Sequence, residues 1–162
     1  MPALSRAEIE RLLPHREPFL FLDRIVECEF GERAVGEIDD VGQYHEHVLR
    51  GHFPAFPVLP GAIIVEALAE VGAVAALGLP ENAGKIAMLT GLDGWKFRRP
   101  VRPGDKLRLE TTLIRSRGRF GRGKGVATVD GMLVAEGELS FAIVDPPAEL
   151  ARSEGSAERE LA

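Results

Sequence analysis

Residues 61–78, with the sequence GAIIVEALAEVGAVAALG, decide the fold of this chain. Only Glu66 and Glu70 carry a charge in this stretch, so a helix formed here would be apolar around nearly its whole circumference. Such a helix either spans a membrane or lies in a protein core. A membrane span needs about 20 apolar residues, and this stretch is shorter and contains two carboxylates. It therefore predicts a buried core helix and no membrane association.

The sequence on both sides of this helix is typical of an antiparallel sheet. Apolar and polar residues alternate after it, and Asp130-Gly131 between two alternating runs is a strong hairpin signal. The strands expected after the helix cover residues 86–97, 106–115, 125–129 and 132–144, with a glycine-rich turn at 118–123. The strands expected before it cover residues 19–30 and 34–38, and a short helix between a Ser5/Glu8 capping box and Pro14 precedes them.

These elements place the chain in the α+β class, as one long buried helix with a mostly antiparallel sheet of about five to seven strands. Residues 1–145 form one domain. The stretch 146–162 contains only two large apolar residues and is expected to be a mobile tail. Because a single sheet covers only part of an all-apolar helix, we expect a second copy of the chain to complete the burial as a homodimer.

Composition narrows the classes of function. The 162 residues carry a net charge of −5, whereas a sequence-independent nucleic-acid binder needs a basic surface, so no nucleic-acid partner is expected. The single cysteine, Cys28, forms no internal disulfide and supplies too few thiolates for a cysteine-based zinc site. The first residues lack the apolar segment of a secretory signal, which favours a cytoplasmic location.

Residues 42–61 are expected to form an irregular loop, because Pro54, Pro57 and Pro60 exclude regular structure and stiffen the chain. An irregular loop of this length inside a compact domain is uncommon and is often functional. His52 lies in it, and an imidazole with an ordinary pKa of about 6.5 suits a base that works near neutral pH. Taken alone, a loop histidine is more often structural than catalytic.

Two further residues have the chemistry of an active site. Glu66 stands about one turn into the apolar helix, and its i±3 and i±4 neighbours include no basic residue. Burial there would favour the neutral acid, which can donate a proton; alternatively, Glu66 faces solvent or pairs with a distant arginine. Gly61 begins the helix, where its free N–H can polarise a carbonyl group, although a glycine at this point also simply permits a tight turn.

Together, these residues resemble a known family. The run GHFPAFPVLPG at 51–61, followed by Glu66, closely resembles the 3-hydroxyacyl-[acyl-carrier-protein] dehydratases of the FabZ type. LPHREPF at 13–19, KFRRPVRPGD at 96–105 and the hairpin at 129–138 are similar to further motifs of that family, so the resemblance covers roughly residues 5–145.

The resemblance implies a hotdog fold, in which a curved antiparallel sheet wraps a long helix. It also implies a homodimer with shared active sites, and three such dimers can associate into a hexamer. The implied reaction is the dehydration of a (3R)-3-hydroxyacyl thioester to the trans-2-enoyl thioester in fatty acid biosynthesis, without cofactor or metal. His52 would be the base at C2 and Glu66 of the other subunit the acid. The Gly61 N–H would polarise the thioester carbonyl, and the Val58 carbonyl would orient His52. Family members that also isomerise carry Asp in place of Glu66.

Three features depart from the family pattern. Glu70 stands where the family usually has Gln, so two carboxylates lie close together and can titrate as a pair. HEHVL at 45–49 and Phe56 also differ from the family pattern. These differences leave open the alternative that the chain is a dehydratase of a specialised polyketide or lipid pathway. His45 and His47 have no thiolate nearby and are expected to be ordinary loop residues. The G-x-x-x-x-G-K pattern at 118–124 lacks the following helix, so it does not predict a phosphate loop.

The partner implied by the resemblance is an acidic acyl carrier protein, which a net-acidic enzyme must meet with a local basic patch. One candidate patch consists of Lys96, Arg98, Arg99 and Arg102, and the other is the basic cluster at 115–124. Alternative functions are a hotdog thioesterase, an enoyl-CoA hydratase-like enzyme acting on coenzyme A esters, and a non-catalytic acyl-binding protein. The two enzyme alternatives lack the joint Gly-His-Phe-Pro and Pro-Gly-x₄-Glu signature of this sequence, and the presence of both His52 and Glu66 argues against the non-catalytic protein.

Overall fold

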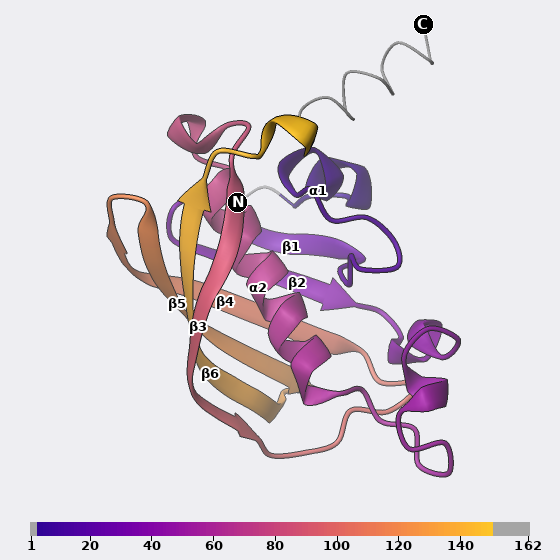
Figure 1. The fold of residues 1–162 in the computed structure, drawn as a ribbon. Helices are drawn as coiled ribbons and strands as arrows, with labels where there is room; N and C mark the ends of the chain where they lie inside the picture. Colours follow the sequence, from indigo (N-terminus) through magenta and orange to yellow (C-terminus); the bar gives the residue numbers. More distant parts are fainter. Residues whose placement is uncertain (1–2, 151–162) are drawn as a thin grey trace, which may run out of the picture.

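The helix α2 (Gly61–Leu77) runs along the concave side of a curved sheet, which wraps around it (Figure 1). The computed structural model describes residues 3–150. Six strands form one sheet in the order β1-β2-β4-β5-β6-β3, and every neighbouring pair is antiparallel. Their bounds are β1 (Arg24–Glu29), β2 (Arg33–Ile38), β3 (Ile86–Phe97), β4 (Leu107–Arg117), β5 (Phe120–Val129) and β6 (Met132–Val144). The α+β hotdog arrangement is thus confirmed.

The first helix, α1 (Arg6–Leu12), begins as the sequence predicts. Ser5 and Glu8 form the capping box, in which each side chain is hydrogen-bonded to the backbone of the other. Residues 13–23 then cross the end of the sheet, and Leu20, Phe21 and Leu22 lie in the core with at most 2% of their surface exposed. The predicted strand therefore starts only at Arg24, because the residues before it are buried as irregular chain.

The helix α2 is already covered within one chain. Along its length only Ala62 is exposed, and Leu68, Val71 and Val74 are completely buried. The expectation that a single sheet leaves much of this helix uncovered is therefore wrong, because the helix contacts all six strands and α1 as well. The largest group of exposed apolar side chains on one strand lies instead on β3, an edge strand. Its exposed apolar side chains are Met88, Leu89, Leu92 and Phe97.

The glycines near the β4–β5 hairpin belong mostly to a strand rather than to the predicted long turn. Only Gly118 and Arg119 form the turn, and β5 begins at Phe120. Gly121 is required by packing, since a Cβ atom there would lie 2.3 Å from Cζ of Phe141. The same is true of Gly137, where a Cβ atom would lie 2.3 Å from Cδ2 of Trp95. Large aromatic rings thus lie over glycines inside the sheet.

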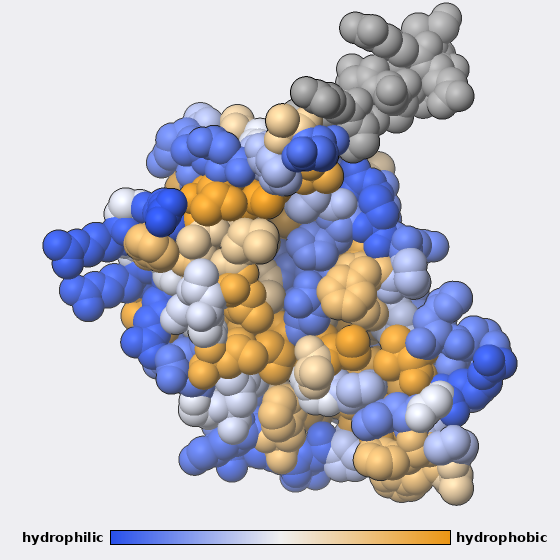
Figure 2. Space-filling model, viewed as in Figure 1, coloured by the Kyte–Doolittle hydropathy of each residue, from blue (hydrophilic) through white to orange (hydrophobic). Residues whose placement is uncertain are grey.

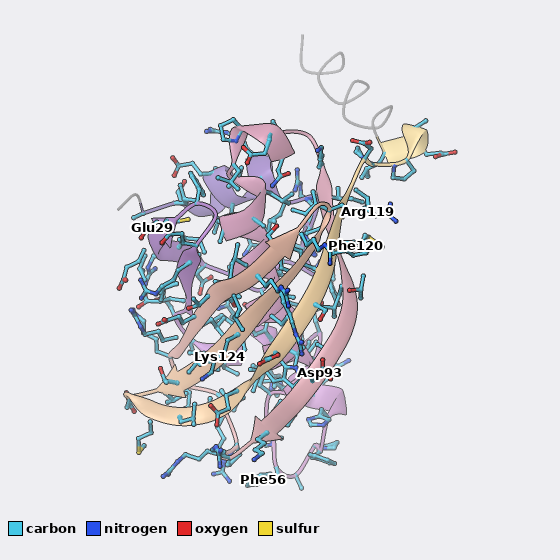
Figure 3. All side chains as sticks on the ribbon, turned by 90° about the vertical axis from the view of Figure 1, so that its left-hand side faces the viewer. Glu29, Phe56, Asp93, Arg119, Phe120 and Lys124 are labelled. Atoms are coloured by element: carbon cyan, nitrogen blue, oxygen red, sulfur yellow. The ribbon has the colours of Figure 1, made fainter. Side chains whose placement is uncertain are left out.

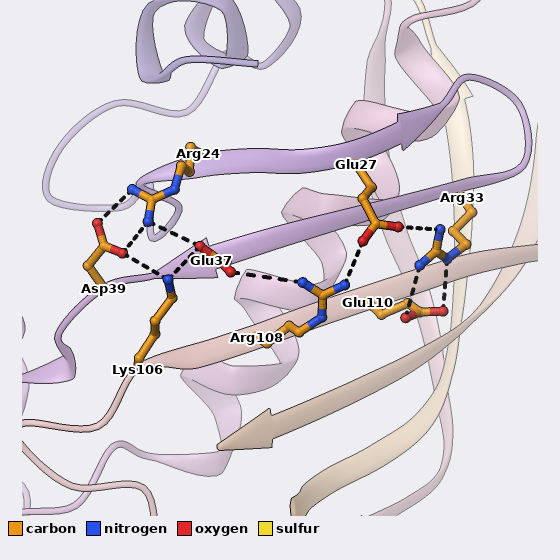
Figure 4. Close-up of polar contacts among 8 residues, drawn as sticks. All are labelled: Arg24, Glu27, Arg33, Glu37, Asp39, Lys106, Arg108 and Glu110. Atoms are coloured by element: carbon orange, nitrogen blue, oxygen red, sulfur yellow. Dashed lines mark hydrogen bonds and ion pairs between the residues drawn. The ribbon is translucent and has the colours of Figure 1, made fainter. Parts of the chain in front are cut away.

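The face of β1, β2 and β4 that points away from the core carries a continuous chain of ion pairs (Figure 4). It consists of Asp39, Arg24, Lys106, Glu37, Arg108, Glu27, Arg33 and Glu110. Because acidic and basic groups alternate along it, this face presents no basic patch to a charged partner.

The proline-containing loop carries slightly more regular structure than the sequence suggests. Two short 3-10 helices, η1 (Val41–Tyr44) and η2 (Leu49–Gly51), lie in it, and a third, η3 (Pro80–Asn82), follows α2. The predicted mobile tail, 146–162, falls mostly outside the described residues. No helix in the described part of the chain is long and apolar enough to cross a lipid bilayer.

Candidate active site

His52 is held by the loop that precedes α2. It follows η2 directly, and its Nδ1 lies 2.9 Å from the backbone oxygen of Val58. A carbonyl oxygen only accepts hydrogen bonds, so Nδ1 carries the proton of the neutral ring and Nε2 is left as the basic nitrogen. The contact between His52 and Val58 expected from the family resemblance is therefore present.

The backbone next to His52 is strained. Phe53 has a φ of 52°, in the left-handed region that bulky residues rarely adopt. Its ring lies against the His52 imidazole, with 4.2 Å between the centroids. Such strain persists only where the surrounding structure enforces it, and it is common at functional sites. Pro54 and Pro57 supply part of that restraint, because each fixes its own φ.

His52 and Gly61 line one open hollow of about 490 Å³, together with Phe97 and Arg98. Gly61 is the first residue of α2, and within the described residues no hydrogen bond uses its N–H. This N–H lies at the positive end of the helix dipole. A Cβ atom on Gly61 would approach Cε1 of Phe97 to 2.8 Å, so only glycine leaves the N–H accessible beside this ring.

Glu66 lines a different, more enclosed cavity of about 140 Å³, which also contains His15 and Glu70. Its side chain is half-buried, and its Oε1 lies 3.3 Å from Nε2 of His15. No residue of α2 can pair with Glu66, and its partner comes instead from the segment between α1 and β1. Within one chain, His52 and Glu66 therefore face different cavities.

The completely buried acid of α2 is Glu70, not Glu66. Glu70 has no exposed surface, its Oε2 accepts a 2.9 Å hydrogen bond from the Phe21 N–H, and its Oε1 has no partner among the described residues. Burial raises the pKa of Glu70 to about 9; the hydrogen bond from Phe21 opposes the shift and the charge of Glu66 adds to it. At neutral pH the Glu70 carboxyl is therefore protonated.

One group of side chains in residues 3–150 has the spacing of a metal site. A ring nitrogen of His15 and one carboxylate oxygen each of Glu66 and Glu70 lie within 4.8 Å of one another. A ligating histidine normally donates its other N–H to a partner, but Nδ1 of His15 is buried without one. Since Glu70 is also neutral, these residues fit a metal ion poorly. His45 and His47 are both exposed on the loop and are not part of this group.

The model of the FabA-like domain family matches residues 13–138 of the sequence. The chain belongs to the FabA-like family. It is 57% identical over 140 residues to the 3-hydroxyacyl-[acyl-carrier-protein] dehydratase FabZ of Roseiflexus castenholzii, which covers 86% of this chain and 96% of the relative. The FabZ of Geobacillus thermodenitrificans is 54% identical over 145 residues, covering 90% of this chain and 99% of the relative.

Solved structures of low sequence identity share the fold. The dehydratase heterocomplex ApeI:P from Xenorhabdus doucetiae superposes with a TM-score of 0.68 at 19% identity, covering 90% of this chain and 95% of that one. A sigma28-regulated virulence protein from Campylobacter jejuni gives a TM-score of 0.64 at 18% identity, covering 88% and 92%. The resemblance to FabZ-type dehydratases drawn from the sequence motifs is confirmed.

For a FabA-like site, the structure adds one residue that the sequence analysis did not single out. His15 stands within the LPHREPF motif at 13–19, and its imidazole lies directly beside Glu66. Its place in that motif is the only sequence feature that points to a role for His15. The sequence of 13–19 does not indicate which face of α2 this segment contacts.

The buried Glu70 carboxyl predicts how stability depends on pH. The unfolded chain ionises this group near its ordinary pKa of 4.5 and the native chain near 9, so between these values the native state binds one more proton. The free energy of unfolding therefore falls as pH rises through this window. Urea titrations from pH 5 upward should show a steeper decline for the wild type than for Glu70→Gln. Glu81→Gln, at an exposed position, is the control, and parallel curves for all three proteins would contradict the assignment.

Proposed function

We propose that this chain dehydrates (3R)-3-hydroxyacyl thioesters of acyl carrier protein to trans-2-enoyl thioesters in fatty acid biosynthesis. The observation that carries the proposal is that this chain is 57% identical to a relative named as this dehydratase, in an alignment that covers 96% of the relative's length. The site supports it, since a histidine with a free Nε2 and a helix N-terminus share one hollow.

The chemistry follows from the roles of three groups. Nε2 of His52 takes the proton from C2, while the Gly61 N–H stabilises the negative charge that develops on the thioester oxygen. The C2–H electron pair forms the C2–C3 double bond as the C3–O bond breaks, and the hydroxyl leaves as water with a proton from Glu66. His52 gains one proton and Glu66 loses one, so a proton returned from one to the other resets the site without any redox step.

The two side chains come together if two copies of β3 pair across a twofold axis. β3 is an edge strand with an unpaired backbone and exposed apolar side chains, which gather over β3 on the face shown in Figure 2. Phe97, at its end, lines the hollow of His52, whereas Met88 and Leu89, near its start, line the cavity of Glu66. Antiparallel pairing sets the end of one β3 beside the start of the other. His52 of one protomer then faces Glu66 of its partner.

For binding of the carrier protein, we favour the patch of Lys96, Arg98, Arg99 and Arg102. Arg98 and Arg99 line the same hollow as His52. Arg98 pairs with Glu136 and Arg102 lies over the Phe56 ring, whereas Arg99 has no ion pair among the described residues. Of the alternative cluster at 115–124, Arg119 lies at the end of the sheet far from Phe56, whereas Lys124 lies nearer to Phe56 (Figure 3) and lines a hollow with Lys96.

The catalytic roles predict a specific loss of turnover. His52→Ala and Glu66→Gln should each lower kcat by about 10²–10⁴-fold, because each removes one proton-transfer group. Turnover is followed through the absorbance of the enoyl thioester formed from 3-hydroxyacyl substrates of several chain lengths. His47→Ala, in the same loop, should keep wild-type rates. Full activity without His52 would remove the assigned base, and release of free acid instead of enoyl product would favour the thioesterase alternative.

The shared site predicts complementation between inactive subunits. A heterodimer of one His52→Ala chain and one Glu66→Gln chain, isolated with two different affinity tags, contains one intact site and should show about half of the wild-type activity. Either homodimer should be inactive. An inactive heterodimer would mean that both groups act within one chain. Mass measurement in solution should show two chains, or six if dimers associate.

The choice between the two basic patches predicts different effects of charge reversal. Arg99→Glu should raise KM more for the carrier-linked substrate than for the same acyl group on coenzyme A, and added salt should shrink the difference. Arg117→Glu, in the hairpin, should leave both values unchanged. The reverse pattern would assign carrier binding to the cluster at 115–124.

A further inference from the structure

We propose that Glu70 is a positioning residue that acts through Glu66, by presenting a neutral carboxyl group whose O–H stabilises the negative charge that Glu66 acquires when it gives up its proton. The inference deepens the proposed function and rests on it, because it assumes that Glu66 is the acid. It assigns a role to a buried group that the reaction of His52 and Glu66 does not otherwise use.

The first support is the placement of Glu70. It follows Glu66 by four residues on α2, so both side chains lie on one face of the helix. Both carboxyl groups line the same enclosed cavity, and one oxygen of each lies within 4.8 Å of the other. A small rotation or one bridging water brings such groups into hydrogen-bond contact.

The second support is the unequal treatment of the two Glu70 oxygens. Oε2 is fixed by the Phe21 N–H at 2.9 Å, which ties the carboxyl to the segment crossing the end of the sheet. Oε1 is buried without a partner among the described residues. An unpaired buried oxygen is costly, and a proton on Oε1 that reaches toward Glu66 removes this cost. With Oε2 held by Phe21, Oε1 is the oxygen left to reach Glu66 by a small rotation or through one water.

The third support comes from the other groups that surround Glu70. Tyr44, in η1, donates its hydroxyl to the Phe21 oxygen at 2.7 Å, and Thr111, in β4, donates its hydroxyl to the Leu68 oxygen at 2.7 Å. Neither hydroxyl is therefore left to serve Glu66. Arg6, on α1, is engaged by Glu10, Glu17 and the Leu22 oxygen.

The remaining neighbour is His15, whose Nε2 lies beside Glu66. No cation that would ionise Glu70 forms an ion pair with it among residues 3–150. Glu70 therefore remains the un-ionised donor of this cavity.

The Glu70 O–H stabilises the transition state of the reaction more than the ground state. While Glu66 holds its proton, an O–H donor beside it contributes little. When the proton passes to the leaving hydroxyl, the charge left on Glu66 is stabilised by a donor already in place, which lowers the barrier. The Glu70 proton stays on Glu70 throughout, so the balance of the reaction is unchanged. An ionised Glu70 would instead repel the charge that forms on Glu66.

The test is the pH profile of kcat from pH 6 to the alkaline limit of substrate stability. The wild type should lose activity as Glu70 ionises on the alkaline side. Glu70→Gln keeps an N–H donor that does not titrate, so it should match the wild type near neutral pH and retain activity beyond the point where the wild type declines. Glu70→Leu has no donor and should lower kcat by about 10²–10³-fold with little change in KM.

A spectroscopic measurement keeps the test independent of activity and of the folding of Glu70→Leu. Besides the band of the Glu66 acid, the infrared spectrum of the wild type at neutral pH should contain a second band of a neutral carboxylic acid, and this second band should be absent from Glu70→Gln. Coinciding pH profiles of wild type and Glu70→Gln, or the lack of this band, would overturn the role of Glu70 while the dehydratase assignment stands. An inactive wild type on every hydroxyacyl thioester would overturn the proposed function itself.

Discussion

The burial of α2 is the constraint on which the rest of this structure depends. A helix with almost no polar face must be surrounded, and here the six-stranded sheet and the crossing segment 13–23 do so within one chain. In such surroundings any polar group on the helix must find a specific partner. Glu70 meets the Phe21 N–H and the Leu68 oxygen meets the Thr111 hydroxyl. The few polar groups of this apolar helix are therefore the groups that the surrounding structure holds at fixed positions.

The same constraint separates the two halves of the proposed site. His52 belongs to the loop before α2 and opens onto one end of β3, whereas Glu66 lies a turn into the helix and opens onto the other end. The two cavities are lined by different parts of α2, with Gly61 in one and Glu66 in the other. Pairing of β3 edges offers a direct solution, because an antiparallel twofold exchanges the two ends. Catalysis and assembly then depend on the same strand.

The sequence predicts a structural feature well where neighbouring residues determine it, and poorly where contacts between distant segments determine it. The bounds of β3, β6 and α2 follow from alternation, a hairpin dipeptide and an apolar run, and these agree with the structure. Residues 19–23 have the sequence pattern of a strand but are irregular, because their backbone groups form hydrogen bonds with side chains of α2 and of other segments. The glycines at 121 and 123 look like a turn but accommodate neighbouring side chains. His15 beside Glu66, and the burial of Glu70, depend on contacts between distant segments and could not be read from local pattern.

The rings that lie over glycines in the sheet have a consequence for how this protein can evolve. Trp95 occupies the space that any side chain at position 137 would need, and its Nε1 is anchored to the Glu138 oxygen at 3.0 Å. A larger residue at 137 becomes acceptable only after the indole has been replaced by something smaller, whereas loss of the indole first leaves a void. Mutational paths through this pair are thus strongly epistatic, and family members that differ at one of the two positions should differ at both.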